Sequence, residues 1–183
     1  MKHKPKPLSQ QVVVITGATS GIGLATARMA SERGARVVLV ARGKRDLQRV
    51  QADLERRGGQ AIAVVADVGV REDVQHVADR ACAAFGGFDT WVNDAGLTIY
   101  GSLDELSDKD KSRLLQTNLW GVIYGSLIAA DHLRARGGTI INLGSVASDL
   151  AFPYQAMYVT SKHAVKGFTD ALRMELLLSL IHI

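Results

Sequence analysis

The chain has 183 residues, of which 47 % are hydrophobic and 22 % are charged. This length predicts a single domain, and the composition is typical of a soluble globular protein. The apolar runs fall well short of the about 20 residues that cross a bilayer, and much of the net charge of +4 lies in the first residues, so we expect neither a membrane nor nucleic acid as a partner. The single cysteine, Cys82, excludes an intrachain disulfide and favours a reducing, cytoplasmic compartment.

The first ten residues differ in composition from the rest. They are rich in lysine and proline and lack the apolar segment of a signal peptide. They predict a basic disordered tail over residues 1–10, followed by one domain over residues 11–183.

Short β-branched runs alternate with helix-like segments along this domain. In a helix-like segment such as Val70 to Phe85, apolar residues recur at spacings of three and four, and Gly86-Gly87 ends the pattern. Strands that are apolar on both faces and alternate with helices indicate a parallel sheet covered on both sides. The expected fold class is α/β, a doubly wound parallel sheet of the Rossmann type in three α/β/α layers. The predicted strands are Val12–Ile15, Arg36–Val40, Ala61–Val65, Phe88–Val92 and Thr139–Leu143.

The first strand leads directly into a glycine-rich segment, Thr16-Gly17-Ala18-Thr19-Ser20-Gly21-Ile22-Gly23, and a helix-like stretch follows. This strand–turn–helix context is what a phosphate-binding motif requires. Gly17 permits the turn, Gly21 lets a pyrophosphate approach the backbone, and Gly23 lets the helix pack closely on the strand. The free N–H groups and the dipole at the helix start favour an anion. A purely structural turn is the alternative, and the context favours a dinucleotide.

The end of the second strand indicates which dinucleotide binds. An acidic residue about twenty positions after the glycines usually binds the ribose 2′-hydroxyl of NAD. Here the segment contains Arg42, and its first acidic residue is Asp46. A guanidinium binds a 2′-phosphate through a charge-assisted fork, so Arg42 predicts a preference for NADP(H) over NAD(H). A solvated basic turn at a helix start is the alternative interpretation.

Three residues in the last third of the chain predict a proton-transfer site. Ser145 follows a predicted strand and therefore lies at the carboxyl edge of the sheet, where ligands bind in such folds. Tyr158 and Lys162 share a predicted helix, and a spacing of four puts them on one face. An ammonium at about 4 Å stabilises a phenolate by roughly 4 kcal/mol at an effective dielectric of about 20, which allows Tyr158 to act as an acid and base. A half-buried tyrosine beside an unrelated lysine is an equally good interpretation of this pair alone.

Together these residues resemble the short-chain dehydrogenase/reductase family. Its glycine motif is matched in full, and Asp67-Val68 resembles the pair that lies near the adenine in that family. Its Asn-Asn-Ala-Gly segment is similar to Asn93-Asp94-Ala95-Gly96, with an aspartate in second place. The resemblance implies catalytic roles for Asn118, Ser145, Tyr158 and Lys162. It implies cofactor binding by Gly17, Thr19, Ser20, Gly21, Ile22, Gly23, Arg42, Asp67, Val68, Asn93, Ala95, Gly96, Tyr158 and Lys162.

The resemblance also implies an activity. It predicts an NADP(H)-dependent oxidoreductase that interconverts a hydroxyl and a carbonyl group of a small-molecule alcohol or ketone. Tyr158 would exchange the proton with the substrate oxygen, and Ser145 would orient that oxygen. Lys162 would assist Tyr158 and bind the nicotinamide ribose, while Asn118 would steady a water-linked proton path. No histidine pair has metal-ligand spacing with a carboxylate or thiol, so we expect no metal.

Family members continue past the helix of Tyr158 and Lys162 into a sixth strand, a substrate loop and a seventh strand, and the sequence carries no signal for these. We therefore expect a domain that lacks the last strands of the fold and leaves the strand at residues 139–143 as an uncovered edge. The alternative function is a dinucleotide-binding protein without catalytic turnover. Small residues at spacing four, Gly121, Gly125 and Ala129, fit either the homo-oligomer interface that the family implies or packing against the sheet.

Overall fold

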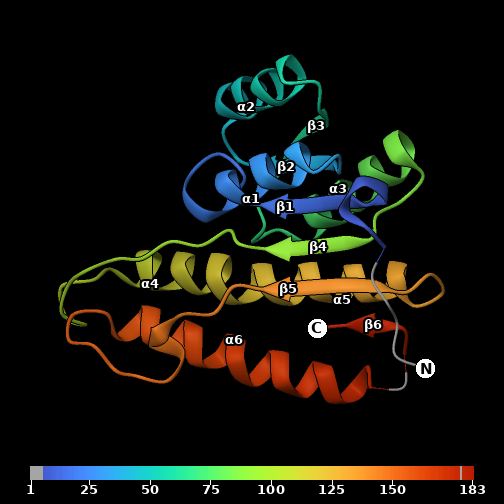
Figure 1. Ribbon diagram of the computed structural model, residues 1–183. Helices are drawn as coiled ribbons and strands as arrows, with labels where there is room; N and C mark the ends of the chain where they lie inside the picture. The colour runs from blue at the N-terminus through green and yellow to red at the C-terminus, as the bar shows by residue number, and fades with distance from the viewer. Residues whose placement is uncertain (1–5, 178) are drawn as a thin grey trace.

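The computed structural model describes residues 6–177 and 179–183, and these form a six-stranded parallel sheet with helices on both faces (Figure 1). The strand order is β3-β2-β1-β4-β5-β6, which confirms the predicted Rossmann class. The strands are β1 (Val12–Thr16), β2 (Arg36–Ala41), β3 (Gln60–Val65), β4 (Thr90–Asn93), β5 (Gly138–Asn142) and β6 (Ile181–His182). The helices are α1 (Gly21–Glu32), α2 (Lys44–Arg56), α3 (Arg71–Phe85), α4 (Asp108–Leu115), α5 (Gly121–Leu133) and α6 (Ala156–Glu175). Two 3₁₀ turns, η1 (Leu8–Gln10) and η3 (Val146–Ser148), and a π-helical segment, η2 (Gln116–Trp120), complete the described elements.

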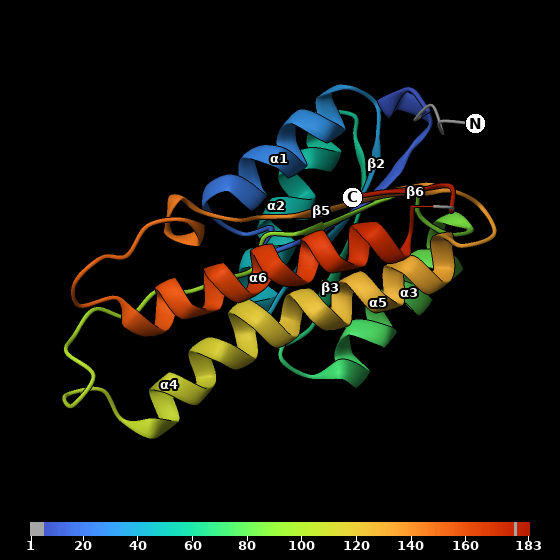
Figure 2. The ribbon, with the colours of Figure 1, turned by 90° about the horizontal axis from the view of Figure 1, so that it is seen from below.

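Successive residues of the central strands point to opposite faces of the sheet, and each face has its own core. On β1, Val12 and Val14 pack with residues of α3, α5 and α6, whereas Val13 and Ile15 pack with residues of α1 and α2. Figure 2 shows these two helical layers on either side of the sheet. Because both faces are covered, β1 is buried along its whole length, which explains its continuous apolar sequence.

Most predicted boundaries hold to within two residues. The helix α3 ends where the glycine pair predicts, at Gly86 with φ of +78°, and the Gly86 N–H donates to the Cys82 carbonyl at 2.9 Å. The fourth strand has the largest shift, because it begins at Thr90, two residues after the predicted start at Phe88. The Phe88 ring stacks on His132 with centroids 4.1 Å apart, and its N–H donates to His132 Nε2 at 3.3 Å. This side-chain bond replaces a bond within the sheet.

The expectation that the domain lacks every strand after the fifth is wrong for the sixth strand. β6 pairs in parallel with β5, with Gly138 opposite Ile181 and Thr139 opposite His182. The side chain of Ile181 is buried in the core formed with α5 and α6. A two-residue strand with one apolar contact produces no periodicity in the sequence, so the pattern could not reveal it. Within the described residues, β6 pairs with β5 as far as Thr139, and Ile141 of β5 is 44 % exposed.

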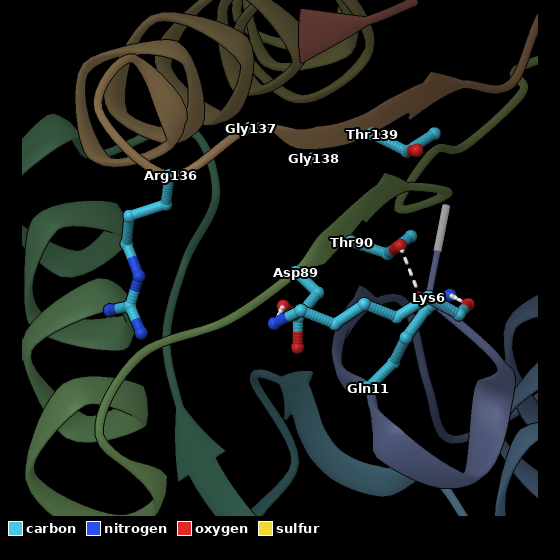
Figure 3. Close-up of a pocket in the computed structure, with 8 residues that line it drawn as sticks. All are labelled: Lys6, Gln11, Asp89, Thr90, Arg136, Gly137, Gly138 and Thr139. Carbon is cyan, nitrogen blue, oxygen red and sulfur yellow. Dashed lines mark hydrogen bonds and ion pairs between the residues drawn. The ribbon is translucent and has the colours of Figure 1, made fainter. Parts of the chain in front are cut away.

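The predicted disordered tail is wrong for residues 6–10, and its first five residues lie outside the described part of the chain. Lys6 Nζ pairs with Asp89 Oδ1 at 2.6 Å, and Gln11 Nε2 donates to the Lys6 carbonyl at 2.6 Å. Figure 3 shows these side chains around a hollow at the amino-terminal edge of the sheet. Its volume is about 10 Å³, room for about one water molecule, so the contacts anchor this segment and form no ligand site.

The small residues of α5 face the sheet. A Cβ on Gly121 would lie 2.8 Å from Val68 Cγ2, and one on Gly125 would lie 2.8 Å from Trp91 Nε1. Ala129 is fully buried. Of the two interpretations of this spacing, packing within the chain is therefore the one that the structure supports.

The buried contact of β6 generates a stability prediction. Replacing Ile181 with alanine removes buried methyl groups and should lower the free energy of unfolding by about 2 kcal/mol. His182→Ala, on the exposed neighbour, is the matched control and should change it by less than about 0.5 kcal/mol. Urea denaturation followed by circular dichroism measures both. Equal stabilities of the two variants would show that β6 is not docked in solution.

Candidate functional site

The candidate site lies at the carboxyl edge of the sheet, where β1, β2, β4 and β5 end (Figure 1, left side). In parallel α/β sheets this edge carries the loops and helix starts that contact ligands. Two cavities open there. The first is lined by the glycine turn and the ends of β2 and β3, and the second by the loops that follow β4 and β5.

The glycine turn is held tightly against the loop after β4. Thr16 Oγ1 accepts the backbone N–H groups of Asp94 and Ala95, each at 3.1 Å. Gly17 has φ of +71°, and a Cβ there would lie 3.0 Å from the backbone nitrogen of Ala95. A Cβ on Gly23 would collide with the Gly17 carbonyl. The two glycines are therefore required by the close approach of three backbone segments.

The amino-terminal end of α1 leaves backbone donors available. The first bond that closes the helix runs from the Leu24 N–H to the Ser20 carbonyl at 3.0 Å, and the Ser20 side chain makes no capping bond. The N–H groups of Gly21, Ile22 and Gly23 thus have no partner within the helix. Gly21 and Ile22 are exposed at this end. Such a helix end attracts an anion.

The first cavity brings together most of the predicted cofactor residues. It has a volume of about 280 Å³. Eight predicted residues line it: Gly17, Thr19, Ser20, Arg42, Asp67, Val68, Ala95 and Gly96. The sequence interpretation missed Arg113 and Thr117, which line the same cavity from α4 and η2. Neither stands in a motif, so only the three-dimensional arrangement reveals them.

Asp67 is fixed in its charged form beside this cavity. Arg113 pairs with its Oδ2 at 2.8 Å, and the Gly69 N–H donates to its Oδ1 at 2.9 Å. Partial burial opposes the charge, but the bonds from Arg113 and Gly69 and the positive charges of Arg113 and Arg42 together hold the pKa of Asp67 below its ordinary value. The carboxylate is thus an oriented acceptor near neutral pH.

Thr117 provides a test of whether the cavity fits a bound molecule. Its hydroxyl oxygen is buried and, within residues 6–177 and 179–183, has no hydrogen-bond partner. A buried hydroxyl without a partner is costly, and a polar ligand in the cavity would relieve that cost. The buried hydroxyl of Thr117, the free N–H groups at the start of α1 and the lack of room for a Cβ on Gly17 and Gly23 together fit a dinucleotide cofactor.

Asn93 lies apart from the predicted cofactor residues. It is buried, and its amide is fully engaged inside the protein. Its Oδ1 accepts from Trp91 Nε1 at 2.8 Å, and its Nδ2 donates to Asn142 Oδ1 at 2.8 Å and to Ser126 Oγ at 3.2 Å. These bonds tie β4 to β5 and α5, so the side chain of Asn93 positions the sheet edge and does not line the cavity.

The second cavity brings Ser145 and Tyr158 together. It has a volume of about 280 Å³, and its lining residues are Thr98, Tyr100, Ser145, Ala147, Phe152, Gln155 and Tyr158. Ser145 Oγ accepts the Ala147 N–H at 3.1 Å, so its hydroxyl proton stays free to be donated elsewhere. Ser145 therefore presents a donor on the wall that it shares with the phenol of Tyr158.

Lys162 lies beside Tyr158 on the same helix, α6, as the spacing of four predicts. Its Nζ is 5.9 Å from the centre of the Tyr158 ring and donates to the Leu143 carbonyl at 2.7 Å. The side chain is buried, and this burial lowers the pKa of Lys162, whereas the negative charge of Asp94 acts in the opposite direction. The buried ammonium of Lys162 thus lies over the ring of Tyr158.

Asn118 occupies the π-helical segment between α4 and α5, a kind of irregularity that is frequent at functional sites. Its Nδ2 donates to the Leu97 carbonyl and its Oδ1 accepts the Leu97 N–H, both at 2.8 Å. Its Nδ2 also lies 3.3 Å from Ser161 Oγ, which donates to the Tyr158 carbonyl at 2.7 Å. Asn118 thus reaches the helix of Tyr158 through Ser161, a link that the sequence motif does not contain.

No group of three or more histidine, cysteine, aspartate or glutamate side chains among the described residues is placed to hold a metal ion. None of the described helices combines the length and apolarity needed to span a membrane.

Comparison with known proteins identifies the class. The family model of the short chain dehydrogenases matches residues 11–183, and the chain belongs to this family. It is 46 % identical over 177 residues to the uncharacterized oxidoreductase YxnA of Bacillus subtilis, covering 96 % of this chain and 50 % of that protein. It is 40 % identical to an 11-beta-hydroxysteroid dehydrogenase A of Sesamum indicum, covering 90 % of this chain and 48 % of that protein. The chain thus spans about half the length of these curated relatives.

A solved structure has the same architecture. A short-chain dehydrogenase/reductase from Burkholderia phymatum, in complex with NAD, superposes with a TM-score of 0.94 at 32 % sequence identity. The match covers 97 % of this chain and 64 % of that protein.

The crowded glycine turn generates a binding prediction. Gly23→Ala would push a methyl group into the Gly17 carbonyl and should weaken NADPH binding by at least about tenfold. Gly167→Ala is the matched control, because nothing lies within 4 Å of a Cβ at that position in α6. Titration of NADPH fluorescence measures both affinities, with circular dichroism as a check of folding. Unchanged NADPH affinity in folded Gly23→Ala would contradict the assigned role of the turn.

Proposed function

We propose that this chain is an NADP(H)-dependent oxidoreductase that interconverts a hydroxyl and a carbonyl group, with Tyr158 as the acid and base. The observation that carries the proposal is the arrangement of three side chains. Tyr158 and Ser145 line one cavity, and the buried ammonium of Lys162 lies 5.9 Å from the Tyr158 ring. Membership of the short chain dehydrogenases supports the reaction class.

Each residue has a role that follows from its contacts. Ser145, with its hydroxyl proton free, holds the substrate oxygen by donating to it. Tyr158 gives a proton to that oxygen or takes one from it, and the charge on Lys162 stabilises the phenolate that results. The bond from Lys162 to the Leu143 carbonyl keeps the ammonium in place through this cycle. Asn118 helps to position Tyr158 indirectly, because it bonds to Ser161, which bonds to the Tyr158 carbonyl.

The cofactor is proposed to bind in the first cavity and along the glycine turn. When bound, a nicotinamide dinucleotide supplies or accepts the hydride. Gly21 and Ile22, exposed at the start of α1, offer backbone donors for its pyrophosphate, and the Asp67 carboxylate offers an oriented acceptor. Lys162 would contribute a donor to the nicotinamide ribose.

Preference for NADP(H) rests on Arg42. Its guanidinium is exposed at the end of β2 and lines the first cavity, and its charge contributes to the lowered pKa of Asp67. Asp46 lines the same cavity but pairs with Arg49 at 3.3 Å, which offsets part of its negative charge. The relative from Burkholderia phymatum was solved with NAD, so the two cofactors have to be compared directly.

The Arg42 assignment predicts a selective loss. Arg42→Ala removes the cation that would bind the 2′-phosphate, so the dissociation constant for NADPH should rise by about tenfold while that for NADH changes little. Arg45→Ala, three residues further on in an exposed position, is the matched control and should leave both constants unchanged. Parallel fluorescence titrations with the two reduced cofactors measure the effect. Equal changes for both cofactors in Arg42→Ala would remove the basis for the NADP(H) preference.

The proposed substrate is an uncharged, mainly apolar alcohol or ketone. The seven residues that line the second cavity include three aromatic rings and no charged side chain. Exposed apolar side chains, including Leu103, Val146 and Leu150, come from the same two loops. A rim of this kind favours apolar molecules and disfavours phosphorylated or acidic ones. The hydroxysteroid dehydrogenase of Sesamum indicum, by its name, acts on a molecule of this class.

The role of Tyr158 predicts that binding and turnover separate. Tyr158→Phe removes the proton donor but keeps the ring, so NADPH should bind with unchanged affinity while ketone reduction falls by at least about a hundredfold. Tyr154→Phe, on an exposed tyrosine outside the lining of the second cavity, is the control and should retain activity. NADPH titration beside an absorbance assay on a panel of apolar ketones measures both properties. Turnover by Tyr158→Phe near the wild-type rate would rule out the assigned role.

The same assay distinguishes the second candidate function. NADPH binding by the wild-type chain without reduction of any ketone in the panel would favour a dinucleotide-binding protein without turnover. The homo-oligomer that the family implies stays a prediction. The small residues Gly121, Gly125 and Ala129 do not support it, because they pack within the chain. Sedimentation of the purified chain would test it.

A further inference from the structure

Asp94 introduces a carboxylate at the place where the glycine turn and α1 meet. Its Oδ2 would lie 2.7 Å from a Cβ on Gly23 and 3.2 Å from a Cβ on Gly17, so this oxygen packs against both glycines of the turn. Its backbone N–H is held by Thr16 Oγ1 at 3.1 Å, which fixes the residue in that position. The side chain is half-buried. The Asp94 carboxylate therefore lies at the glycine turn, where the proposed cofactor would place a second negative group, its pyrophosphate.

The carboxylate interacts with the same helix end as the proposed pyrophosphate. The Gly23 N–H, one of the three donors of α1 without a partner in the helix, favours the charged form of Asp94. Gly21 and Ile22 are left to bind an external anion. Two negative groups at one helix end repel each other, whereas an uncharged Asp94 would remove that repulsion and keep its size.

The charged groups around Asp94 are few. From α6, Lys162 contributes the positive charge that acts on it. The strands β1 and β4 carry no charged side chain, and α1 has its charged residues, Arg28 and Glu32, in its second half. Partial burial raises the pKa of Asp94 above its ordinary value, and the Gly23 N–H and Lys162 oppose that rise. Among the residues that the structure describes, Lys162 is thus the charged side chain that balances the charge of Asp94.

We propose that Asp94 sets the affinity of the dinucleotide site, because binding of the pyrophosphate is coupled to uptake of a proton by the Asp94 carboxylate. This inference rests on the proposed function, since it requires a dinucleotide in the cradle. The pyrophosphate adds negative charge beside Asp94 and so favours its protonated form. By linkage, affinity increases as the pH falls through the Asp94 titration and decreases to a constant lower value above it.

The test is calorimetric titration of the full chain with NAD⁺, at several values between about pH 5 and about pH 7.5. NAD⁺ is the probe because the 2′-phosphate of NADP⁺ has its own titration near pH 6. Repeating each titration in two buffers of different ionisation enthalpy gives the number of protons taken up. The wild type should take up protons at the acidic end and should bind more tightly there.

Asp94→Asn keeps the size of the side chain and removes its charge. This variant should bind NAD⁺ more tightly than the wild type near pH 7.5, on the order of tenfold, and should lose most of the proton uptake. Asp79→Asn removes a negative charge from an exposed position on α3 and is the matched control, with affinity and proton uptake as in the wild type. Lys162 is present in all three proteins, so any pH dependence that remains in Asp94→Asn belongs to other groups.

Three results would overturn the inference, and they differ in their meaning. Wild-type affinity that is independent of pH, with no proton uptake, overturns it without any variant and leaves the proposed function intact. Absence of binding of both NAD⁺ and NADP⁺ to the wild type and to Asp94→Asn overturns the proposed function and this inference with it. Weaker binding by folded Asp94→Asn would also contradict the inference, because it would show that the charge assists the cofactor.

Discussion

The close approach of the glycine turn to the loop after β4 is the constraint on which the site depends. Thr16 holds that loop by two backbone N–H groups, and Gly17 and Gly23 leave no room for a side chain. Because this contact joins β1 to β4, it also joins the glycine turn to the segment that leads to Leu97. Leu97 is in turn bound at both its backbone groups by Asn118. One series of hydrogen bonds, made by the side chains of Thr16, Asn118 and Ser161, thus connects the glycine turn to the π-helical segment and to α6.

The sheet supports this arrangement because a network of side-chain hydrogen bonds joins its strands to α5 and α6 below the loops. Asn93, the last residue of β4, places all of its amide bonds on β5, α5 and Trp91. Asn142 of β5 continues the network to Thr169 of α6 at 3.0 Å. Buried amides with every bond satisfied hold their elements in one relative position. The loop that carries Ser145 and the helix α6 that carries Tyr158 are both joined to this network, although the nearby loop side chains Val146 and Leu150 are exposed and apolar.

The sequence predicted the parts of this protein that repeat a local pattern. Neighbouring residues are enough to predict the alternating strands, the glycine turn and the pairing of Tyr158 with Lys162. The structure contains all three features. It could not predict Arg113, Thr117 or Ser161, because their relation to the site depends on how α4, η2 and α6 pack. The same limit explains the errors over β6 and residues 6–10. Each depends on a long-range contact, Ile181 in the core and Lys6 with Asp89, which leaves no trace in local composition.

Lys162 is subject to two opposing demands. In the proposed function it acts on Tyr158, and burial protects that action from screening by water, but the same burial lowers the pKa of Lys162. A carboxylate in the neighbouring loop offsets this, because the negative charge of Asp94 favours the ammonium. The same carboxylate lies at the start of α1, where the proposed pyrophosphate would be a second negative group. A negative charge at position 94 thus favours the charged form of Lys162, but it would lower the affinity of the start of α1 for a pyrophosphate. An asparagine, the residue that the family segment carries here, would relieve the competition at α1 but would withdraw the support from Lys162.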